Sequence, residues 1–394
     1  MPDKKNYAID TLLTHAGNHP ELNYGIVNPP VYHASTILFP TIEKMEQAQK
    51  ERLSGVSYGR WGTPTTFAFE EAVAAIEGEG RALALPSGLA AIGATLLSLL
   101  KAGDHLLMVD SVYGPARSLC DKTLARFGID VTYYDPLVGT GIAGLMRPNT
   151  RLVYLESPGS LTFEVQDVPA IVAAAHAGGA LAIMDNTWAT PLLFRALGRG
   201  VDIVIYAATK YFVGHSDAML GAIVVRDLDL YRMLKVAAHG MGYCAAPDDC
   251  YLGLRGLRTL GVRLQRHGEN GLALARWLQG RPEVARVLHP GLPEHPGHPL
   301  WRRDFTGASG LFSVVLKPCA PAAVAALVEG MRLFGMGASW GGYESLLLPV
   351  KPETTRTATA WSPGGPTLRI HAGLEAVEDL VADLEDGFRR LAAA

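Results

Sequence analysis

The chain is poor in the residues that mark several classes of protein. Cysteine occurs 4 times in 394 residues, at Cys120, Cys244, Cys250 and Cys319, with neither a CxxC pair nor a zinc-ligand spacing. Neither a disulfide framework nor a structural metal site is therefore predicted. We expect reduced thiols that mostly pack in the interior.

Clustered charge and long hydrophobic runs are also missing. The formal net charge is −3, and Lys and Arg are scattered, so neither nucleic acid nor an anionic membrane is an expected partner. The longest apolar stretch, residues 90–100, falls well short of the about 20 residues that span a bilayer. The first ten residues hold no apolar signal core, which predicts a cytoplasmic protein that acts on a small molecule.

Hydrophobic residues make up 48% of the chain, and many fall into short apolar runs separated by helical stretches. Seven such runs predict strands at 82–85, 105–109, 131–134, 152–155, 181–184, 203–206 and 221–225. This alternation predicts an α/β fold with a mostly parallel, seven-stranded sheet covered by helices.

Changes in pattern along the chain predict three parts. Residues 1–60 carry turn-forming residues around one polar helix near 41–52 and indicate an extended N-terminal arm. Residues 61–255 form the large domain. Residues 256–394 form a smaller α+β C-terminal domain, with an amphipathic helix at 257–280, apolar stretches at 310–316 and 331–340, and a final helix at 376–391.

Three suggestive groups follow predicted strands, where ligands bind in open α/β sheets. Asp185 and Lys210 each come after a buried strand, and Gly88 and Leu89 begin a helix. Alone, each has an ordinary explanation: a helix cap, a turn cap, or a lysine that reaches solvent. Together, an amine, an acid and a phosphate-binding helix start are what pyridoxal phosphate requires.

Four motifs carry a family resemblance, at 58–65 (YGRWGTPT), 87–91 (SGLAA), 185–191 (DNTWATP) and 208–221 (ATKYFVGHSDAMLG). They resemble the Cys/Met-metabolism pyridoxal-phosphate family, and the similarity runs from THAG at 14–17 to LRIHAGLE at 368–375. The resemblance implies the aspartate-aminotransferase-like fold, known as fold type I, and pyridoxal 5'-phosphate as cofactor.

The resemblance also implies roles for residues at the cofactor. Lys210 would form the Schiff base and then remove the substrate Cα proton, and Asp185 would pair with the protonated pyridine nitrogen. Tyr113 would stack on the ring. The phosphate would bind Gly88, Leu89 and the Thr209 hydroxyl, and Ala207 stands where many relatives have a serine.

Two more residues would reach the phosphate from a neighbouring subunit. In relatives, the positions of Tyr58 and Arg60 contribute to the partner's site, which implies a homo-oligomer, usually a tetramer built from dimers. Without the resemblance, a Gly-rich segment of this kind would be read as an exposed loop.

The C-terminal part would bind the substrate. Arg369 would hold its α-carboxylate, Ser339 would steady the lysine and orient the substrate, and Trp340 would line the pocket. Without the resemblance, Arg369 could instead be a strand arginine that faces water, and Trp340 could be a core aromatic residue. The sequence at 338–346 and at 156–160 resembles β-eliminating members of the family.

This implies α,β-elimination of L-cystathionine to L-homocysteine, pyruvate and ammonia, a step of methionine biosynthesis. Open alternatives are a cystathionine γ-lyase or γ-synthase and a broader cysteine-S-conjugate β-lyase, while Pro115 disfavours a methionine γ-lyase. A regulator without activity is disfavoured by the intact Lys210, Asp185 and Arg369.

Several histidines invite a different reading. His215 and Asp217 resemble a catalytic pair, but no nucleophile accompanies them, so a turn-stabilising role is expected. A metal site could be suggested by His289, His295, His298 and His371, but the first three lie in a Pro/Gly-rich loop without helical or hairpin ligand spacing, so no metal is predicted.

Overall fold

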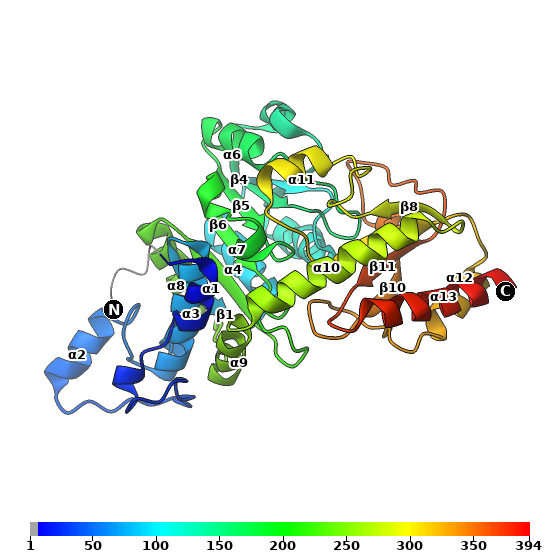
Figure 1. The fold of residues 1–394 in the computed structure, drawn as a ribbon. Coiled ribbons are helices and arrows are strands. Elements are labelled where there is room, and N and C mark those ends of the chain that lie inside the picture. Colours follow the sequence, from blue (N-terminus) through cyan, green and yellow to red (C-terminus); the bar gives the residue numbers. More distant parts are fainter. Residues whose placement is uncertain (1–6) are drawn as a thin grey trace.

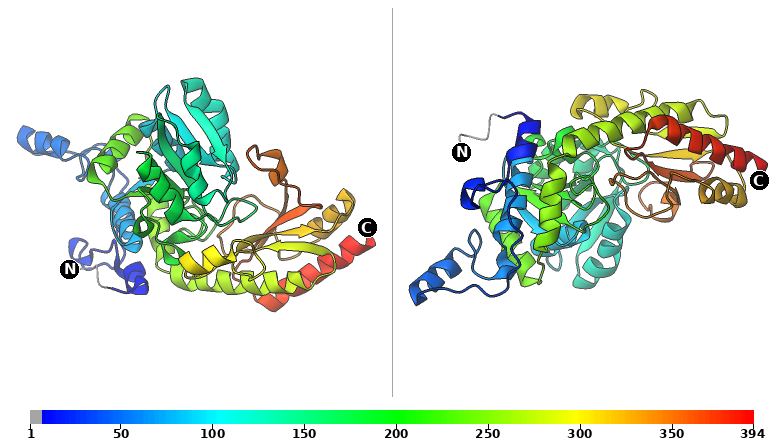
Figure 2. Two further views of the ribbon diagram at one scale, coloured as in Figure 1. Left: turned by 90° about the horizontal axis from the view of Figure 1, so that it is seen from above. Right: turned by 60° about the horizontal axis from the view of Figure 1, so that its bottom comes forward.

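A computed structural model describes residues 7–394. The first six residues of the expected 1–60 arm lie outside this range. The described chain contains a large sheet with helices on both faces, a smaller sheet near the C-terminus, and an N-terminal arm that projects from the body (Figure 1). Figure 2 shows the arm and the C-terminus at opposite ends of the molecule.

The large sheet has seven strands in the order β1-β7-β6-β5-β4-β2-β3. All seven predicted strands are confirmed. Strand β7 runs antiparallel to both of its neighbours, β1 and β6, and the other pairs are parallel. The strands are β1 (Arg81–Leu85), β2 (His105–Val109), β3 (Asp130–Tyr134), β4 (Thr150–Glu156), β5 (Leu181–Asp185), β6 (Ile203–Tyr206) and β7 (Gly221–Val225).

The central strands are recognisable in the sequence because they are buried on both faces. Every residue of β2, β6 and β7 is buried, so these strands read as continuous apolar runs. Helices α3, α4, α6 and α8 pack against the sheet. The helices before the second sheet are α1 (Ile9–His15), α2 (Ile42–Lys50), α3 (Pro64–Glu77), α4 (Gly88–Leu99), α5 (Gly114–Leu119), α6 (Val168–Ala177), α7 (Thr190–Leu193), α8 (Leu228–Gly240) and α9 (Pro247–Leu257).

The second sheet has four antiparallel strands in the order β10-β11-β9-β8. Helices α10, α12 and α13 pack with it around a second hydrophobic core. The elements are α10 (Leu260–Gln279), β8 (Val284–Leu288), α11 (His298–Asp304), β9 (Leu311–Leu316), α12 (Pro321–Glu329), β10 (Leu346–Val350), β11 (Thr367–His371) and α13 (Val377–Ala393).

Two C-terminal expectations need adjustment. The apolar stretch at 331–340 forms no strand and makes one isolated bridge, Gly335 to Leu346. The helix expected at 257–280 begins at Leu260, because the chain turns at Arg258, whose guanidinium donates hydrogen bonds to the carbonyls of Leu13 and Ala16, both at 2.8 Å.

The arm contains α2, which the Thr41 side chain caps by accepting a hydrogen bond from the Lys44 N–H. None of the described residues of α2 is buried. Its apolar side chains therefore have no core to join within this chain.

The expectations about membrane-spanning segments and cysteine thiols can be compared with the structure of residues 7–394. None of the helices there is both long and apolar enough to cross a membrane; the cytoplasmic location stays a prediction. All four thiols are free, with Cys120 and Cys250 buried as expected and Cys244 exposed.

Candidate active site

The carboxyl ends of adjacent parallel strands bring the first site residues together. Glu156 at the end of β4 lies opposite Asp185 at the end of β5, and Asp185 lies opposite Ile205 in β6. Lys210 lies in a turn that follows β6, and its backbone N–H donates a hydrogen bond to the Ala207 carbonyl at 3.0 Å. The strand order thus places an acid and an amine together at the carboxyl ends of the parallel strands, as predicted.

Lys210 lies against the C-terminal part of the chain. Its Nζ donates a hydrogen bond to the Ser339 hydroxyl at 2.6 Å and lies 5.4 Å from the centre of the Trp340 ring. Burial lowers the pKa of Lys210 to about 8, and the charge of Arg369 acts in the same direction, while Asp185 opposes them. A larger fraction of Lys210 is therefore in the neutral, nucleophilic amine form near neutral pH than for an ordinary lysine.

Asp185 is a buried carboxyl, 8% exposed. Burial raises its pKa, and hydrogen bonds from Thr187 together with the charge of Lys210 partly offset this effect. The Thr187 N–H donates to Oδ1 at 3.0 Å and fixes the side chain. A cationic partner would favour the ionised form of this carboxyl.

Arg369, on β11, and Tyr113, after β2, line the same space. The Arg369 guanidinium donates to the Ser339 carbonyl at 2.8 Å, and burial lowers its pKa while Tyr113 opposes this shift. Burial raises the pKa of Tyr113, as do Asp185 and Glu156, and Arg369 acts against them. Tyr113 is therefore close enough to Asp185, Glu156 and Arg369 for their charges to act on its phenol.

The loop that carries Ser339 and Trp340 has a constrained backbone. Ser339 has a φ of 81°, which is uncommon for a residue with a side chain. Gly341 follows with a φ of 85°, and its N–H donates to His371 Nε2 at 3.1 Å. A Cβ on Gly341 would lie 3.0 Å from the Lys210 carbonyl carbon, so the loop needs glycine there to approach the lysine closely.

The start of α4 offers the expected anion site. Ser87 caps the helix by accepting the Ala90 N–H at 3.0 Å, and the N–H groups of Gly88 and Leu89, in the first turn, have no acceptor within the helix. A Cβ on Gly88 would lie 2.5 Å from the Ala207 Cβ. This close approach brings the helix start beside the turn that leads to Lys210.

The Thr209 hydroxyl already has partners in the chain. It donates to the Leu220 carbonyl at 3.1 Å and accepts the Leu220 N–H at 2.8 Å. A second threonine, Thr187, accepts the Ala207 N–H at 2.8 Å. Both hydroxyls therefore shape the turn around Lys210.

Tyr58 and Arg60 are not brought to the lysine by this single chain. Arg60 donates to the His239 carbonyl, and the Tyr58 hydroxyl accepts a hydrogen bond from Ser35 at 3.4 Å. Among the contacts of residues 7–394, none joins either residue to Lys210 or Asp185. Their expected role at a neighbouring subunit's site stays a prediction.

The sequence did not single out two polar residues of the site. Glu156 accepts the Tyr113 N–H at 2.7 Å, and burial, then the charge of Asp185, raises its pKa well above the usual range. Thr187 holds Asp185 in place. A carboxylate at a strand end is the same signal that identified Asp185, so Glu156 could have been found in this way.

The discounted histidines make local contacts. His215 Nδ1 bonds to the Val213 carbonyl at 2.7 Å, and His289 and His295 each accept a backbone N–H two residues onward at 3.0 Å. Within residues 7–394, no group of three or more histidine, cysteine or acidic side chains is arranged to hold a metal ion.

Comparison with known proteins agrees with this geometry. The family described as "Cys/Met metabolism PLP-dependent enzyme" matches residues 10–389. The chain belongs to this family. It is therefore a pyridoxal-phosphate-dependent enzyme of fold type I, as the sequence motifs predicted.

Relatives carry more specific names. The chain is 51% identical to a "Putative cystathionine beta-lyase" of Rhizobium johnstonii, covering 100% of both chains, and 44% identical to "Cystathionine beta-lyase MetC" of Escherichia coli, covering 99% of this chain and 100% of the relative. An "L-alanine/L-glutamate racemase" of Wolbachia pipientis is 41% identical, with 97% of each chain covered. A cystathionine gamma synthase structure from Xanthomonas oryzae has a TM-score of 0.90 at 34% identity, covering 98% of this chain and 99% of that one.

The residues at the site fit the family's cofactor. A buried lysine amine suits its aldehyde, a buried carboxyl suits its pyridine nitrogen, and free N–H groups at the start of α4 suit its phosphate. The close contact at Gly88 brings the helix start beside the turn before Lys210, and the one at Gly341 brings the Ser339 loop against Lys210.

Proposed function

We propose that the chain catalyses the α,β-elimination of L-cystathionine to L-homocysteine, pyruvate and ammonia, as a carbon–sulfur lyase of methionine biosynthesis. The observation that carries the proposal is the convergence of the Lys210 amine with Asp185 and Arg369 in a family of pyridoxal-phosphate enzymes. The names of relatives at 41–51% identity over nearly the whole chain support the choice of substrate.

The catalytic roles follow from the positions of the groups. Bound pyridoxal phosphate supplies an aromatic ring that withdraws electrons from the substrate Cα. Lys210 removes the Cα proton with its neutral amine, which the lowered pKa makes available. The Asp185 carboxylate would accept a hydrogen bond from the protonated pyridine nitrogen and so keep the ring electron-poor. The N–H groups of Gly88 and Leu89 would hold the phosphate, and the Thr209 hydroxyl would join them by turning its single proton away from the Leu220 carbonyl.

Four residues would position the substrate. Arg369 binds the α-carboxylate, for which a planar guanidinium provides two parallel donors. Ser339 holds the Lys210 amine through its 2.6 Å hydrogen bond, and Trp340 forms a wall of the pocket. Tyr113 would stack on the cofactor ring, with its phenol toward the substrate.

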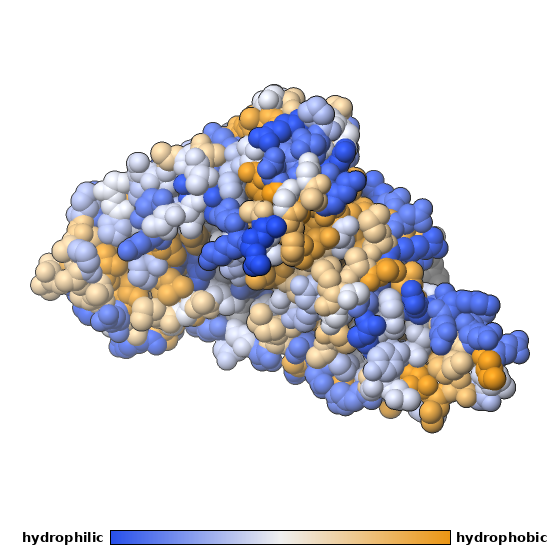
Figure 3. Space-filling model, turned by 180° about the vertical axis from the view of Figure 1, so that it is seen from behind, coloured by the Kyte–Doolittle hydropathy of each residue, from blue (hydrophilic) through white to orange (hydrophobic). Residues whose placement is uncertain are grey.

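We also propose that the functional protein is a homo-oligomer, a tetramer built from dimers, in which Tyr58 and Arg60 complete a neighbour's phosphate site. The arm exposes large apolar side chains: Leu38 is 88% exposed and Ile42 is 73% exposed. Hydrophobic residues are visible on the projecting part at the lower right of Figure 3. A second copy of the chain would bury them.

Product analysis tests the reaction. Purified holoenzyme given L-cystathionine should release pyruvate and homocysteine, and Lys210→Ala should abolish this release. Lys101→Ala should retain it, because Lys101 is exposed and lies before β2, at the opposite end of that strand from Tyr113. Pyruvate release by Lys210→Ala at the wild-type rate would overturn the assignment.

Two other reactions have specific support and give different products. The similarity to a cystathionine gamma synthase structure keeps γ-chemistry as a candidate, and a γ-lyase would give 2-oxobutyrate and cysteine from the same substrate. The racemase among the relatives suggests proton transfer at Cα without elimination. If this chain were a racemase, it would interconvert L- and D-alanine without releasing an oxo acid.

A further inference from the structure

A buried carboxylate outside the site described above connects the two halves of the chain. Asp110 follows β2 and precedes Tyr113 by three positions. Its side chain has no exposed surface, and it forms an ion pair with Arg117, whose side chain is 7% exposed. The Arg117 guanidinium also lies 3.5 Å from the centre of the Tyr133 ring.

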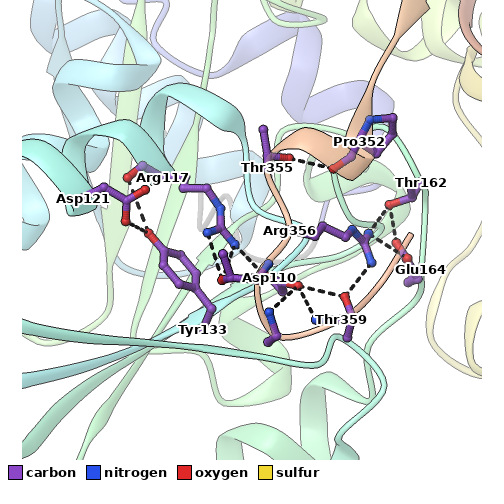
Figure 4. Close-up of polar contacts among 12 residues, drawn as sticks. Asp110, Arg117, Asp121, Tyr133, Thr162, Glu164, Pro352, Thr355, Arg356 and Thr359 are labelled. Carbon is purple, nitrogen blue, oxygen red and sulfur yellow. Dashed lines mark hydrogen bonds and ion pairs between the residues drawn. The ribbon is translucent and has the colours of Figure 1, made fainter. Parts of the chain in front are cut away.

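Asp110 is bound by a segment almost 250 positions later in the chain. We call residues 351–366, which join β10 to β11, the β10–β11 segment. Three successive N–H groups of this segment donate to the Asp110 carboxylate: Thr357 at 3.0 Å, Ala358 at 3.1 Å and Thr359 at 2.8 Å. The Thr359 hydroxyl donates as well, at 2.8 Å, and Figure 4 shows these contacts converging on Asp110.

A second anchor holds the same segment. Arg356, with a side chain 5% exposed, forms an ion pair with Glu164 at 2.7 Å and donates to the Thr162 hydroxyl (Figure 4). The loop that carries Glu164 is tied in turn to the loop after β2, because the Ser160 N–H donates to the Ser111 carbonyl at 2.8 Å.

The donors outweigh the cost of burying this carboxylate. Burial alone would raise the pKa of Asp110, but the hydrogen bonds from Thr357, Thr359 and Ala358 hold it below its ordinary value. The group is therefore an anion at neutral pH, and each of its bonds is charge-assisted.

The position of these contacts suggests a role in the reaction. On one side of Asp110 the chain leads to Tyr113, and the β10–β11 segment leads into β11, which carries Arg369. The charge of Arg369 acts on Tyr113, because it opposes the burial that raises the pKa of the Tyr113 phenol. We propose that Asp110 is a positioning residue, which ties the β10–β11 segment to the Tyr113 loop and thereby fixes the separation of Tyr113 and Arg369 for substrate binding.

This inference rests on the proposed function, in which both residues meet the substrate. Releasing the segment would let the two sides of the site move independently, so that only a fraction of molecules would bind substrate productively. The apparent affinity falls in proportion to that fraction. No hydrogen bond or ion pair within residues 7–394 joins the segment to Lys210, Asp185 or the start of α4, so these three cofactor contacts should persist.

The test compares Asp110→Asn with Asp104→Asn in the holoenzyme. Asp104 lies at the other end of β2, is also buried, accepts the Lys101 N–H at 2.9 Å and pairs with Arg151, but does not touch the segment. We expect Asp110→Asn to raise KM for L-cystathionine by about tenfold with kcat changed less than about threefold, and Asp104→Asn to change neither. An unchanged KM in folded, cofactor-loaded Asp110→Asn would overturn the proposal.

A milder variant and a second measurement cover the case in which Asp110→Asn does not fold. Thr359→Val removes the hydroxyl that donates to Asp110 and accepts from Arg356, and it should raise KM in the same direction by a smaller factor. Hydrogen exchange followed by mass spectrometry should show faster exchange in both 351–361 and 111–117 for this variant. Faster exchange in 351–361 alone would contradict the proposed coupling. If wild-type enzyme makes no pyruvate but these peptides still respond together, the reaction assignment fails and the coupling stands.

Discussion

The charge of a single carboxyl should decide how well the cofactor works. Asp185→Asn keeps the size and one acceptor oxygen of the side chain but cannot balance a protonated pyridine nitrogen. We expect kcat to fall by about 10²-fold or more, the scale seen when one electrostatic contact to developing charge is lost. Steady-state pyruvate release measures this, with Asp202→Asn, at the opposite end of the sheet, as the control. Retained activity in Asp185→Asn would remove Asp185 from the proposed mechanism.

The lowered pKa of Lys210 should be visible in how the apoenzyme takes up its cofactor. A neutral amine attacks an aldehyde and a protonated one does not. Because burial lowers the pKa of Lys210 to about 8, the rate of covalent attachment should rise with pH up to about pH 8 and then level off. Stopped-flow absorbance measures this rate.

Nα-acetyl-lysine is the control for that experiment, since any ionisation of the aldehyde itself affects both reactions equally. Its rate should keep rising toward pH 10. A protein rate that follows the free amine over the same range would show that the site does not perturb Lys210.

The start of α4 should be sensitive to a single added methyl group. Gly88→Ala would place a Cβ 2.5 Å from the Ala207 Cβ, whereas Gly93→Ala, on the same helix, would meet nothing closer than 3.7 Å. We therefore expect Gly88→Ala to weaken cofactor binding by about tenfold or more as the helix start moves away from the Lys210 turn, and Gly93→Ala to leave it unchanged. Equilibrium titration of apoenzyme with pyridoxal phosphate checks both.

Elements differed in how readily the sequence revealed them. Strands β2, β6 and β7 of the large sheet are buried on both faces, so their composition alone marked them. Strand β8 has a mixed burial pattern, with two exposed residues in the middle, and gives no comparable signal. The start of α10 was placed too early because the turn at Arg258 depends on carbonyls of the N-terminal segment, which no local pattern contains.

The candidate site shows the same division. Asp185 and Lys210 could be predicted because ligands generally bind beyond the carboxyl ends of the strands in an open α/β sheet. Ser339, Trp340 and Arg369 depended on the family resemblance, since neither spacing nor composition relates them to Lys210. The partners of Asp110 lie in the β10–β11 segment, so only the folded chain reveals their contact.

At the scale of the assembly, subunit mixing tests the proposed exchange of arms. Lys210→Ala and Arg60→Ala should each be nearly inactive. If Arg60 acts in the neighbouring subunit's site, a hybrid dimer has one site with both changes and one with neither. Random re-association after mild dissociation should then restore about a quarter of the wild-type sites, measured as pyruvate release. No recovery in confirmed hybrids would place Arg60 in its own subunit's site.

Helix α10 has a mechanical consequence for the whole chain. Its first half contributes Leu260 and Leu264 to the core of the large sheet, and its second half contributes Leu274 and Leu278 to the core of the small one. Heating that melts either sheet must strip half of this helix from its packing and leave the remainder poorly supported. The two halves of the subunit should consequently melt as one cooperative unit, giving a single calorimetric peak and not two.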